Sequence, residues 1–466
     1  MMRTDWLWLA PLSLLSTPAF AQALTPAEQA QIDKVVTDAL ADTGVPSAEI
    51  AIVRGGRIVL SRAYGKQCER CGAPDPTLPY QIASNSKQFT AMAMLLLEDE
   101  GRLNLDDHVA RYLLGISGGD TITVRQLLSH TSGLQDYWPQ DYSFKAMATP
   151  VTPAQIVDRW ARKPLDFTPG TQWQYSNTGY VVAGLIVEKV AGMPLLDLLR
   201  QRIFGPLGIR AIDQDLARGP GFPDGYRRLA LGPVRVETPA ARGWLYAAGE
   251  LSMSAQDLAR WDIARMDRAL VPADDWAAQE TPVRLADGST TGYGLGVFAG
   301  VADGRRFVEH SGEAVGFLSE NMVLPDDKAA VVVLTNAWFS DAYRRIATAI
   351  SRIILPTPPA TADDQAAMVK VRQVYDQLRT GTLDARLLTA DAAYYFNPAA
   401  QADYRTSLQP LGEPAAFTQA GKTALRGGFV ERNYRVSYPG RVLQIGTFAE
   451  PGPGGRLEQL LVSPAQ

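Results

Sequence analysis

The stretch Ile82-Ala83-Ser84-Asn85-Ser86-Lys87-Gln88-Phe89-Thr90 decides the fold, because it opens a long apolar segment. No helix breaker interrupts residues 84–100, which are rich in Ala, Met and Leu, and Gly101 follows where a C-terminal capping glycine belongs. This pattern predicts a buried helix over residues 84–100. Because residues i and i+3 share a helix face, the Ser84 hydroxyl and the Lys87 amine can meet on its first turn.

A serine and a lysine on the first turn of a buried helix suit nucleophilic chemistry. Desolvation lowers the pKa of a buried lysine, which lets the amine act as a base toward a nearby hydroxyl. The helix N-terminus also directs backbone N–H groups at developing negative charge. An S-x-x-K pattern arises by chance on the order of once in a chain of this length, so the pattern alone does not identify a site.

Two further motifs carry groups that a hydrolase uses. Tyr175-Ser176-Asn177 lies between two glycines, just before an apolar segment. A tyrosine beside a lysine can shuttle a proton, and an asparagine can hydrogen-bond a substrate amide. His310-Ser311-Gly312 ends a predicted strand, where glycine lets a substrate backbone approach the strand edge closely. Taken singly, the first motif is compatible with surface structure and the histidine with a structural role.

The three motifs S-x-x-K, Y-x-N and H-x-G, in this order, make the chain similar to the serine β-lactamase-related superfamily. That superfamily includes class C β-lactamases, D-alanyl-D-alanine carboxypeptidases, D-aminopeptidases and family VIII esterases. The resemblance covers about Leu24 to Leu355. Neighbouring phrases support it: Leu127-Leu128-Ser129-His130-Thr131-Ser132-Gly133-Leu134, Phe167-Thr168-Pro169-Gly170, Gly249-Glu250-Leu251-Ser252-Met253-Ser254 and Val315-Gly316-Phe317.

The resemblance implies a role for each motif residue. Ser84 attacks a carbonyl and forms an acyl-enzyme. Lys87 and Tyr175 exchange the proton, first with the hydroxyl and later with the leaving group. Asn177 positions the substrate side chain or amide. The backbone N–H groups of Ser84 and Glu313 form the oxyanion hole that the resemblance implies.

His310 departs from the family pattern, because it stands where the K-T-G motif of β-lactamases has a lysine. Together with Gly312, it is expected to contact the substrate. Histidine is neutral over much of the pH range and holds a substrate carboxylate less firmly than lysine does. The departure disfavours a true β-lactamase and favours peptidase or esterase relatives. His130, within the Leu127–Leu134 phrase, is interpreted as part of a structural loop.

Length, net charge and hydropathy restrict the number of domains, the class of partner and the location of the protein. The 466 residues are long for one domain and comfortable for two. A net charge of −4 argues against a general nucleic-acid binder, which needs a basic face. Residues 1–21 are typical of an export signal, with Ala19-Phe20-Ala21 as the cleavage site, so a periplasmic or secreted location is expected. No other segment is apolar enough to span a membrane.

The two cysteines, Cys68 and Cys71, are separated by two residues. One C-x-x-C pair cannot supply four zinc ligands, and the three histidines are scattered along the chain. In an exported protein, the pair predicts a local disulfide that closes a short loop and stabilises it modestly. No metal and no cofactor are expected.

The order of the elements predicts two folded parts. An N-terminal helix, a hairpin, the Ser84 helix, an inserted all-helical region, late strands and a last helix predict a hydrolase domain over residues 22–355. Its class is α/β (α+β) of the β-lactamase/transpeptidase type, with an antiparallel sheet flanked by helices. A proline-rich linker follows at 356–363. Residues 364–466 predict a small, separate α+β domain, weakly similar to NTF2-like or SnoaL-like modules.

These observations favour a serine hydrolase that acts through an acyl-enzyme on a D-amino-acid peptide or an ester. The partner is then a small-molecule or peptide substrate, and the sequence indicates no oligomeric state. Two alternatives stay open: a β-lactamase proper, and an inactive binding or scaffold protein on the same fold. An intact set of Ser84, Lys87, Tyr175 and Asn177 speaks against the second, since an inactive relative has no chemical need of it.

Overall fold

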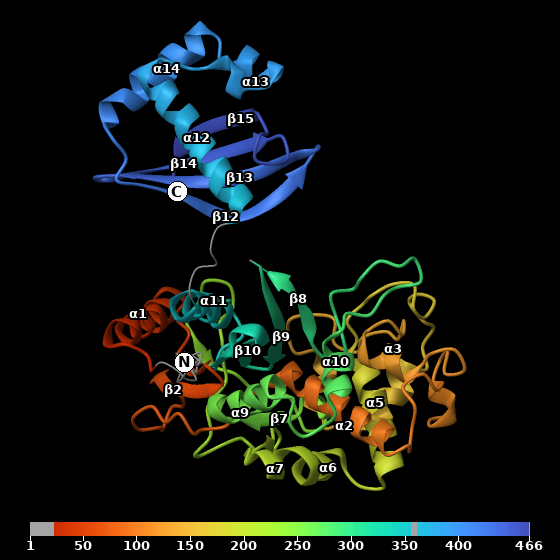
Figure 1. Cartoon of the computed structure of the whole chain (residues 1–466). Coiled ribbons are helices and arrows are strands. Elements are labelled where there is room, and N and C mark those ends of the chain that lie inside the picture. Colours follow the sequence, from red (N-terminus) through yellow and green to blue (C-terminus); the bar gives the residue numbers. More distant parts are fainter. Residues whose placement is uncertain (1–22, 303, 356–360, 466) are drawn as a thin grey trace, which may run out of the picture. The chain divides into compact units, whose positions relative to one another are not determined.

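The computed structural model describes residues 23–302, 304–355 and 361–465. The predicted signal peptide at 1–21 and residues 356–360 of the predicted linker lie outside these ranges. The chain divides into two compact units, Met1–Pro356 and Thr357–Gln466 (Figure 1). Each unit is described separately below. Among the residues that the structure describes, we find no helix that is both long and apolar enough to span a membrane.

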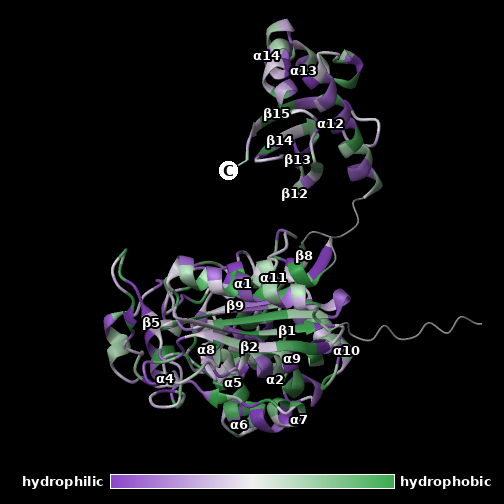
Figure 2. Cartoon of the chain, turned by 90° about the vertical axis from the view of Figure 1, so that its left-hand side faces the viewer, coloured by the Kyte–Doolittle hydropathy of each residue, from purple (hydrophilic) through white to green (hydrophobic). Residues whose placement is uncertain are grey.

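A six-stranded antiparallel sheet forms the centre of the first unit, in the order β2-β1-β11-β10-β9-β8. The strands are β1 (Ser47–Arg54), β2 (Arg57–Gly65), β8 (Phe298–Ala302), β9 (Arg305–Ala314), β10 (Phe317–Leu324) and β11 (Ala329–Thr335). Every residue of β11 is buried, and a strand apolar on both sides needs cover on both faces. Figure 2 shows the apolar strands between helices above and below them.

Helices α1 (Pro26–Thr43) and α11 (Ala342–Ile354) cover one face of this sheet. The predicted N-terminal helix is α1, and it begins with a capping box in which Thr25 and Glu28 satisfy each other's backbone N–H groups. Val36 of α1 and Ile350 of α11 pack against the apolar residues of β1 and β11. The prediction that terminal helices cover one face of an antiparallel sheet is therefore confirmed.

The opposite face supports α9 (Ala255–Met266), α2 (Lys87–Asp99) and the inserted helical region. The prediction of a helix starting at Ser84 was wrong by one turn. Residues Ala83–Ser86 form a tight 3₁₀ turn, and α2 begins only at Lys87. The backbone of Ala83 has a φ of 50°, which an alanine seldom adopts, so the chain enters this turn at an angle that an α-helix does not allow.

The inserted region is built mainly of short helices around α5 (Asn177–Ala191), whose apolar residues contribute to the main core. Thr152 and Gln155 form a capping box at the start of α4, and this helix changes to a π-turn at Val157. Its other helices are α3 (Val124–Leu128), α4 (Pro153–Ile156), α6 (Leu195–Leu199), α7 (Gly205–Leu207), α8 (Tyr246–Gly249) and α10 (Ala273–Glu280). The prediction that this region is all-helical was wrong, because it also contains the short strands β4 (Ile212–Asp213), β5 (Tyr226–Arg227), β6 (Arg235–Val236) and β7 (Leu251–Met253). Strand β3 (Tyr80–Gln81), which precedes Ser84, pairs with β7.

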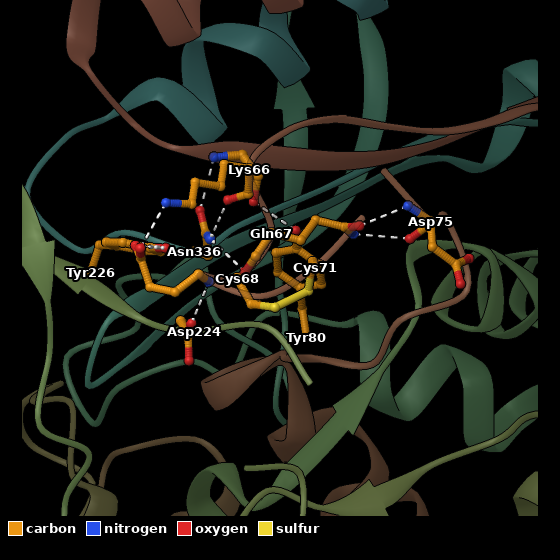
Figure 3. The surroundings of a disulfide bond; sticks show 11 residues. Lys66, Gln67, Cys68, Cys71, Asp75, Tyr80, Asp224, Tyr226 and Asn336 are labelled. Carbon is orange, nitrogen blue, oxygen red and sulfur yellow. Dashed lines mark hydrogen bonds and ion pairs between the residues drawn. A yellow bond between two sulfur atoms is a disulfide. The ribbon is translucent and has the colours of Figure 1, made fainter. Parts of the chain in front are cut away.

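A disulfide joins Cys68 to Cys71 in the loop between β2 and β3. Figure 3 shows the hydrogen bonds that join Gln67 in this loop to Asp75 and to Asn336. The buried Gln67 amide accepts from the backbone N–H of Asp75 at 2.7 Å and donates to its carbonyl oxygen at 2.9 Å. Asn336, just after β11, donates to the Gln67 carbonyl oxygen at 3.1 Å. The crosslinked loop therefore anchors the chain shortly before Ser84.

The second unit has an α+β fold with its own core. It consists of α12 (Ala362–Thr380), α13 (Ala390–Tyr395), α14 (Pro398–Leu408), β12 (Ala416–Arg426), β13 (Phe429–Tyr438), β14 (Arg441–Ala449) and β15 (Leu457–Pro464). The four strands form an antiparallel sheet in sequence order. The residue patterns at 364–378, 434–438, 442–448 and 457–462 are typical of the elements α12, β13, β14 and β15, whereas no such pattern predicted β12, α13 and α14.

Candidate active site

Ser84 lies in the 3₁₀ turn that precedes α2, on the sheet face that carries the helical region. Every residue from Tyr80 to Leu97 is buried except Ser84, which is partly exposed. The preceding residue, Ala83, holds the strained φ of 50°. Strained backbone of this kind persists where the surrounding structure determines it, and it is common beside reactive groups. The fold thus leaves Ser84 accessible to solvent within a segment that is otherwise buried.

Lys87 is fully buried, and its amine faces Ser84. Its Nζ lies 2.9 Å from Ser84 Oγ, 2.8 Å from Asn177 Oδ1 and 2.7 Å from the carbonyl oxygen of Ala248. Burial lowers the pKa of Lys87 to about 7, and the negative charge of Asp136 acts in the opposite direction. A large fraction of this amine is therefore uncharged near neutral pH, as a general base must be.

Tyr175 comes from the segment just before α5 and lies beside both groups. Burial raises the pKa of Tyr175 well above its usual value, while a hydrogen bond with the Ser84 side chain lowers it. Lys87 Nζ lies 4.9 Å from the centre of the Tyr175 ring. Tyr175 is therefore a neutral phenol at physiological pH. It can pass a proton between neighbours, although it is not itself a strong base.

Asn177 is the first residue of α5, and its side-chain amide is held at both ends. Its Oδ1 accepts from Lys87, while its Nδ2 donates to Asp136 Oδ2 at 3.2 Å. The backbone N–H of Asn177 donates to Asp136 Oδ1 at 3.1 Å. Burial raises the pKa of Asp136, and its hydrogen bonds from Trp138 and Asn177 lower it. One Nδ2 hydrogen remains free for a substrate.

His130 is fully buried and packs against the site. Its ring centre lies 4.2 Å from that of Tyr175, and its Nδ1 accepts from the backbone N–H of Ser176 at 3.1 Å. Burial lowers the pKa of His130 well below its usual value, so the ring is neutral and carries its proton on Nε2. His130 therefore packs against the ring of Tyr175, within the loop that was interpreted as structural.

His310 is also buried, and both of its ring nitrogens have partners inside the protein. Its Nδ1 donates to the Ser311 carbonyl oxygen, so Nε2 accepts from the Tyr293 hydroxyl at 2.9 Å. Burial, assisted by the positive charge of Lys87, lowers the pKa of His310 to about 3. The expected contact between His310 and a substrate carboxylate stays a prediction, and it requires one nitrogen to leave its partner.

Gly312 brings β9 against the turn that carries Ser84. A Cβ atom at Gly312 would lie 2.1 Å from the carbonyl oxygen of Ile82 and 2.4 Å from Ser319 Oγ, so a larger residue does not fit. Glu313 follows on the same strand. Burial raises the pKa of the Glu313 carboxyl to about 7, and the negative charge of Asp141 acts in the same direction.

Sequence reasoning missed Asp136 and Tyr293. Asp136 lies 41 residues before Asn177 in the chain, and no residue spacing predicts such a pairing. Tyr293 lies between α10 and β8, where no motif in the sequence distinguishes it. Their roles come from tertiary packing, which brings loops of the helical region to β9.

The family model described as Beta-lactamase matches residues 32–354, which is well over half of the chain. The chain belongs to the Beta-lactamase family. This finding confirms the resemblance stated from the motifs, and the described residues of the matched range form the first unit. The Beta-lactamase family fold also accounts for the antiparallel sheet with helices on both faces.

The similarity to curated relatives extends over two thirds or more of this Beta-lactamase family chain. Protein flp of Staphylococcus aureus (strain N315) is 30% identical over 334 residues, and the match covers 67% of this chain. The chain spans 64% of the length of that relative. Penicillin-binding protein 4* of Bacillus subtilis (strain 168) is 29% identical over 401 residues, covering 80% of this chain and 87% of the relative.

Two solved structures that are similar to this chain differ in sequence identity and in how much of the chain they cover. A D-stereospecific amidohydrolase from Streptomyces sp. is 31% identical with a TM-score of 0.59, covering 68% of this chain and 96% of that one. An octameric penicillin-binding protein homologue from Pyrococcus abyssi is 21% identical with a TM-score of 0.62, covering 93% and 95%. The second match shows a common fold, and it covers more of the chain than the first unit alone.

Proposed function

We propose that this protein is an exported serine hydrolase that cleaves amide or ester bonds through an acyl-enzyme on Ser84. One observation carries the proposal: the buried amine of Lys87 lies 2.9 Å from the partly exposed hydroxyl of Ser84. An uncharged amine at this distance can take the hydroxyl proton as the oxygen attacks a carbonyl. The family membership supports the same reaction class.

The remaining groups suit the later steps of this reaction. The backbone N–H groups of Ser84 and Glu313 would bind the oxyanion of the tetrahedral intermediate, where each donor stabilises the transition state by about 3 kcal/mol. Tyr175 would relay the proton from Lys87 to the leaving group, which departs as an amine or alcohol when the bond to the carbonyl carbon breaks. Water then attacks the acyl-enzyme, and the same two residues take its proton and return one to Ser84 Oγ.

The charges around the site favour substrates without a carboxylate beside the scissile bond. His310 is neutral and both of its nitrogens are engaged, and the Glu313 carboxyl lies near Asp141. A substrate carboxylate bound near Glu313 would face negative charge, whereas a free amine of the substrate would not. We therefore place D-amino-acid amides or peptides and simple esters ahead of β-lactams. The similarity to a D-stereospecific amidohydrolase supports this ranking.

The test compares wild-type protein with Ser84→Ala on D-alanine p-nitroanilide, p-nitrophenyl butyrate and nitrocefin. We expect Ser84-dependent turnover of the first two and slow or absent turnover of nitrocefin. A fluorescent phosphonate should label the wild type and spare the variant. Equal labelling of both proteins would contradict the proposal and favour a scaffold role. Fast nitrocefin turnover would instead identify a β-lactamase proper.

A further inference from the structure

Asp136 connects the loop after the His130 segment to the start of α5. Its two carboxylate oxygens accept from the backbone N–H and the side-chain Nδ2 of Asn177, at 3.1 Å and 3.2 Å. The far end of the same amide, Oδ1, accepts from Lys87 Nζ at 2.8 Å. Hydrogen bonds therefore run without interruption from Asp136 through Asn177 and Lys87 to Ser84.

The carboxylate determines which way the Asn177 amide points. An ionised carboxylate only accepts hydrogen bonds, so the NH₂ end of the amide must face Asp136. The oxygen end is then directed to Lys87, where it accepts a hydrogen bond from Nζ. Without Asp136 the amide can turn over and present its NH₂ group to Lys87, and the protonated lysine, which has only donors, then loses this contact. Lys87 would then lose one of the two other contacts, to Asn177 Oδ1 and to the carbonyl oxygen of Ala248, that hold its amine beside Ser84.

Asp136 also supplies negative charge near the lysine. The rings packed around Lys87 belong to Tyr175 and Tyr180, at 4.9 Å and 5.4 Å from Nζ, with His130 and His310 behind them. Both histidines are neutral and both tyrosines are phenols, so these groups place no negative charge beside the amine. Asp136 is the carboxylate whose charge favours the protonated lysine.

We propose that Asp136 is a positioning residue for the hydrolysis: it orients the Asn177 amide toward Lys87, and its charge balances the lysine ammonium formed during the reaction. The inference rests on the proposed function and adds a fourth member to its hydrogen-bonded set. It acts through Asn177 and Lys87 and does not require that Asp136 touch the substrate.

Two variants separate the geometry of Asp136 from its charge. Asp136→Asn keeps the size and removes the charge, so kcat for p-nitrophenyl butyrate should fall about 10- to 100-fold. The acid limb of its pH profile should move to lower pH, because Lys87 then loses its proton more easily. Asp136→Glu keeps the charge and displaces the oxygens, so kcat should fall while the acid limb stays near its wild-type position. Circular dichroism establishes that each variant is folded.

Asp166→Asn is the matched control, because Asp166 also accepts from a side-chain amide, that of Gln174 at 2.9 Å, and lies outside the chain of contacts. It should keep the wild-type kcat and pH profile. In an Asn177→Ala background, replacing Asp136 should lower kcat little further. If both Asp136 variants behave like the control while turnover still depends on Ser84, this inference alone is overturned. If the wild type has no Ser84-dependent turnover, the proposed function fails with it.

Discussion

At the scale of single residues, burial of Lys87 is the feature from which the proposed chemistry follows. An exposed lysine would be protonated at neutral pH and could not accept the Ser84 proton. Burial lowers the pKa of Lys87 to about 7, and the contacts to Asn177 and Ala248 hold the amine in place despite the loss of water. The fold thus produces a base at neutral pH from a residue type that is ordinarily an acid.

The first prediction concerns pH and the charge of Lys87. Since the base form is required, kcat/KM for an ester should rise as pH increases through about 7, where Lys87 loses its proton. Lys87→Arg keeps a positive charge at all accessible pH values, so kcat should fall by about 100-fold or more. The measurement is a pH–rate profile from pH 5 to pH 9 for both proteins.

Glu313 supplies the control for this assignment, because the pKa of its carboxyl is also about 7. Glu313→Gln removes that titration and should leave the acid limb in place. Lys34→Arg, at an exposed ion pair with Asp38, should change neither kcat nor the profile. Loss of the limb in Glu313→Gln would assign it to the carboxyl and would contradict the role given to Lys87.

At the scale of elements, sequence periodicity predicted those parts that are long and uniformly buried. β11 and α2 are almost entirely buried, and α1 carries both halves of a capping box. Each of these signals is local, so it can be read from one segment. The motifs for Ser84, Lys87, Tyr175 and Asn177 were likewise visible in single segments.

The short elements of the helical region could not be predicted in the same way. α3 has 5 residues and α4 has 4 before its π-turn, which is too short for a clear helical period. The 3₁₀ turn at Ala83–Ser86 depends on a backbone angle that no residue pattern specifies. Asp136 is invisible in sequence for a related reason, since its contact with Asn177 exists only after both loops pack.

The second prediction concerns the contact between β9 and the Ser84 turn. Gly312→Ala would place a methyl group 2.1 Å from the Ile82 carbonyl oxygen, so strand and turn must separate. The proposed oxyanion donor at Glu313 would move with the strand, and kcat should fall about 100-fold. Kinetics with p-nitrophenyl butyrate, together with thermal unfolding, measure both effects.

Gly72→Ala is the matched control for Gly312→Ala. No atom lies within 4 Å of a Cβ at Gly72, which also has no positive φ, so the same change is tolerated there. It should leave kcat and the melting temperature unchanged. A Gly312→Ala protein with wild-type kcat would show that the close approach of β9 has no part in catalysis.

At the scale of the whole molecule, the two units bury separate apolar cores. The core of the second unit is formed by residues between Val371 and Leu460, whereas the cores beside the central sheet use residues between Leu24 and Ile354. Prolines at 356, 358 and 359 indicated this division in the sequence. The fold of the second unit was less visible, because β12, α13 and α14 carry weak local patterns.

The last prediction follows from these separate cores. A chain that ends at Pro356 retains the whole central sheet, its covering helices and every proposed catalytic residue. The buried residues of these cores end at Ile354. The shortened chain should therefore fold and hydrolyse p-nitrophenyl butyrate, with kcat and KM within about twofold of the full-length values. Circular dichroism melting and steady-state kinetics test this, with Ser84→Ala in the shortened chain as the inactive control. A folded but inactive shortened chain would show instead that the second unit takes part in forming the site.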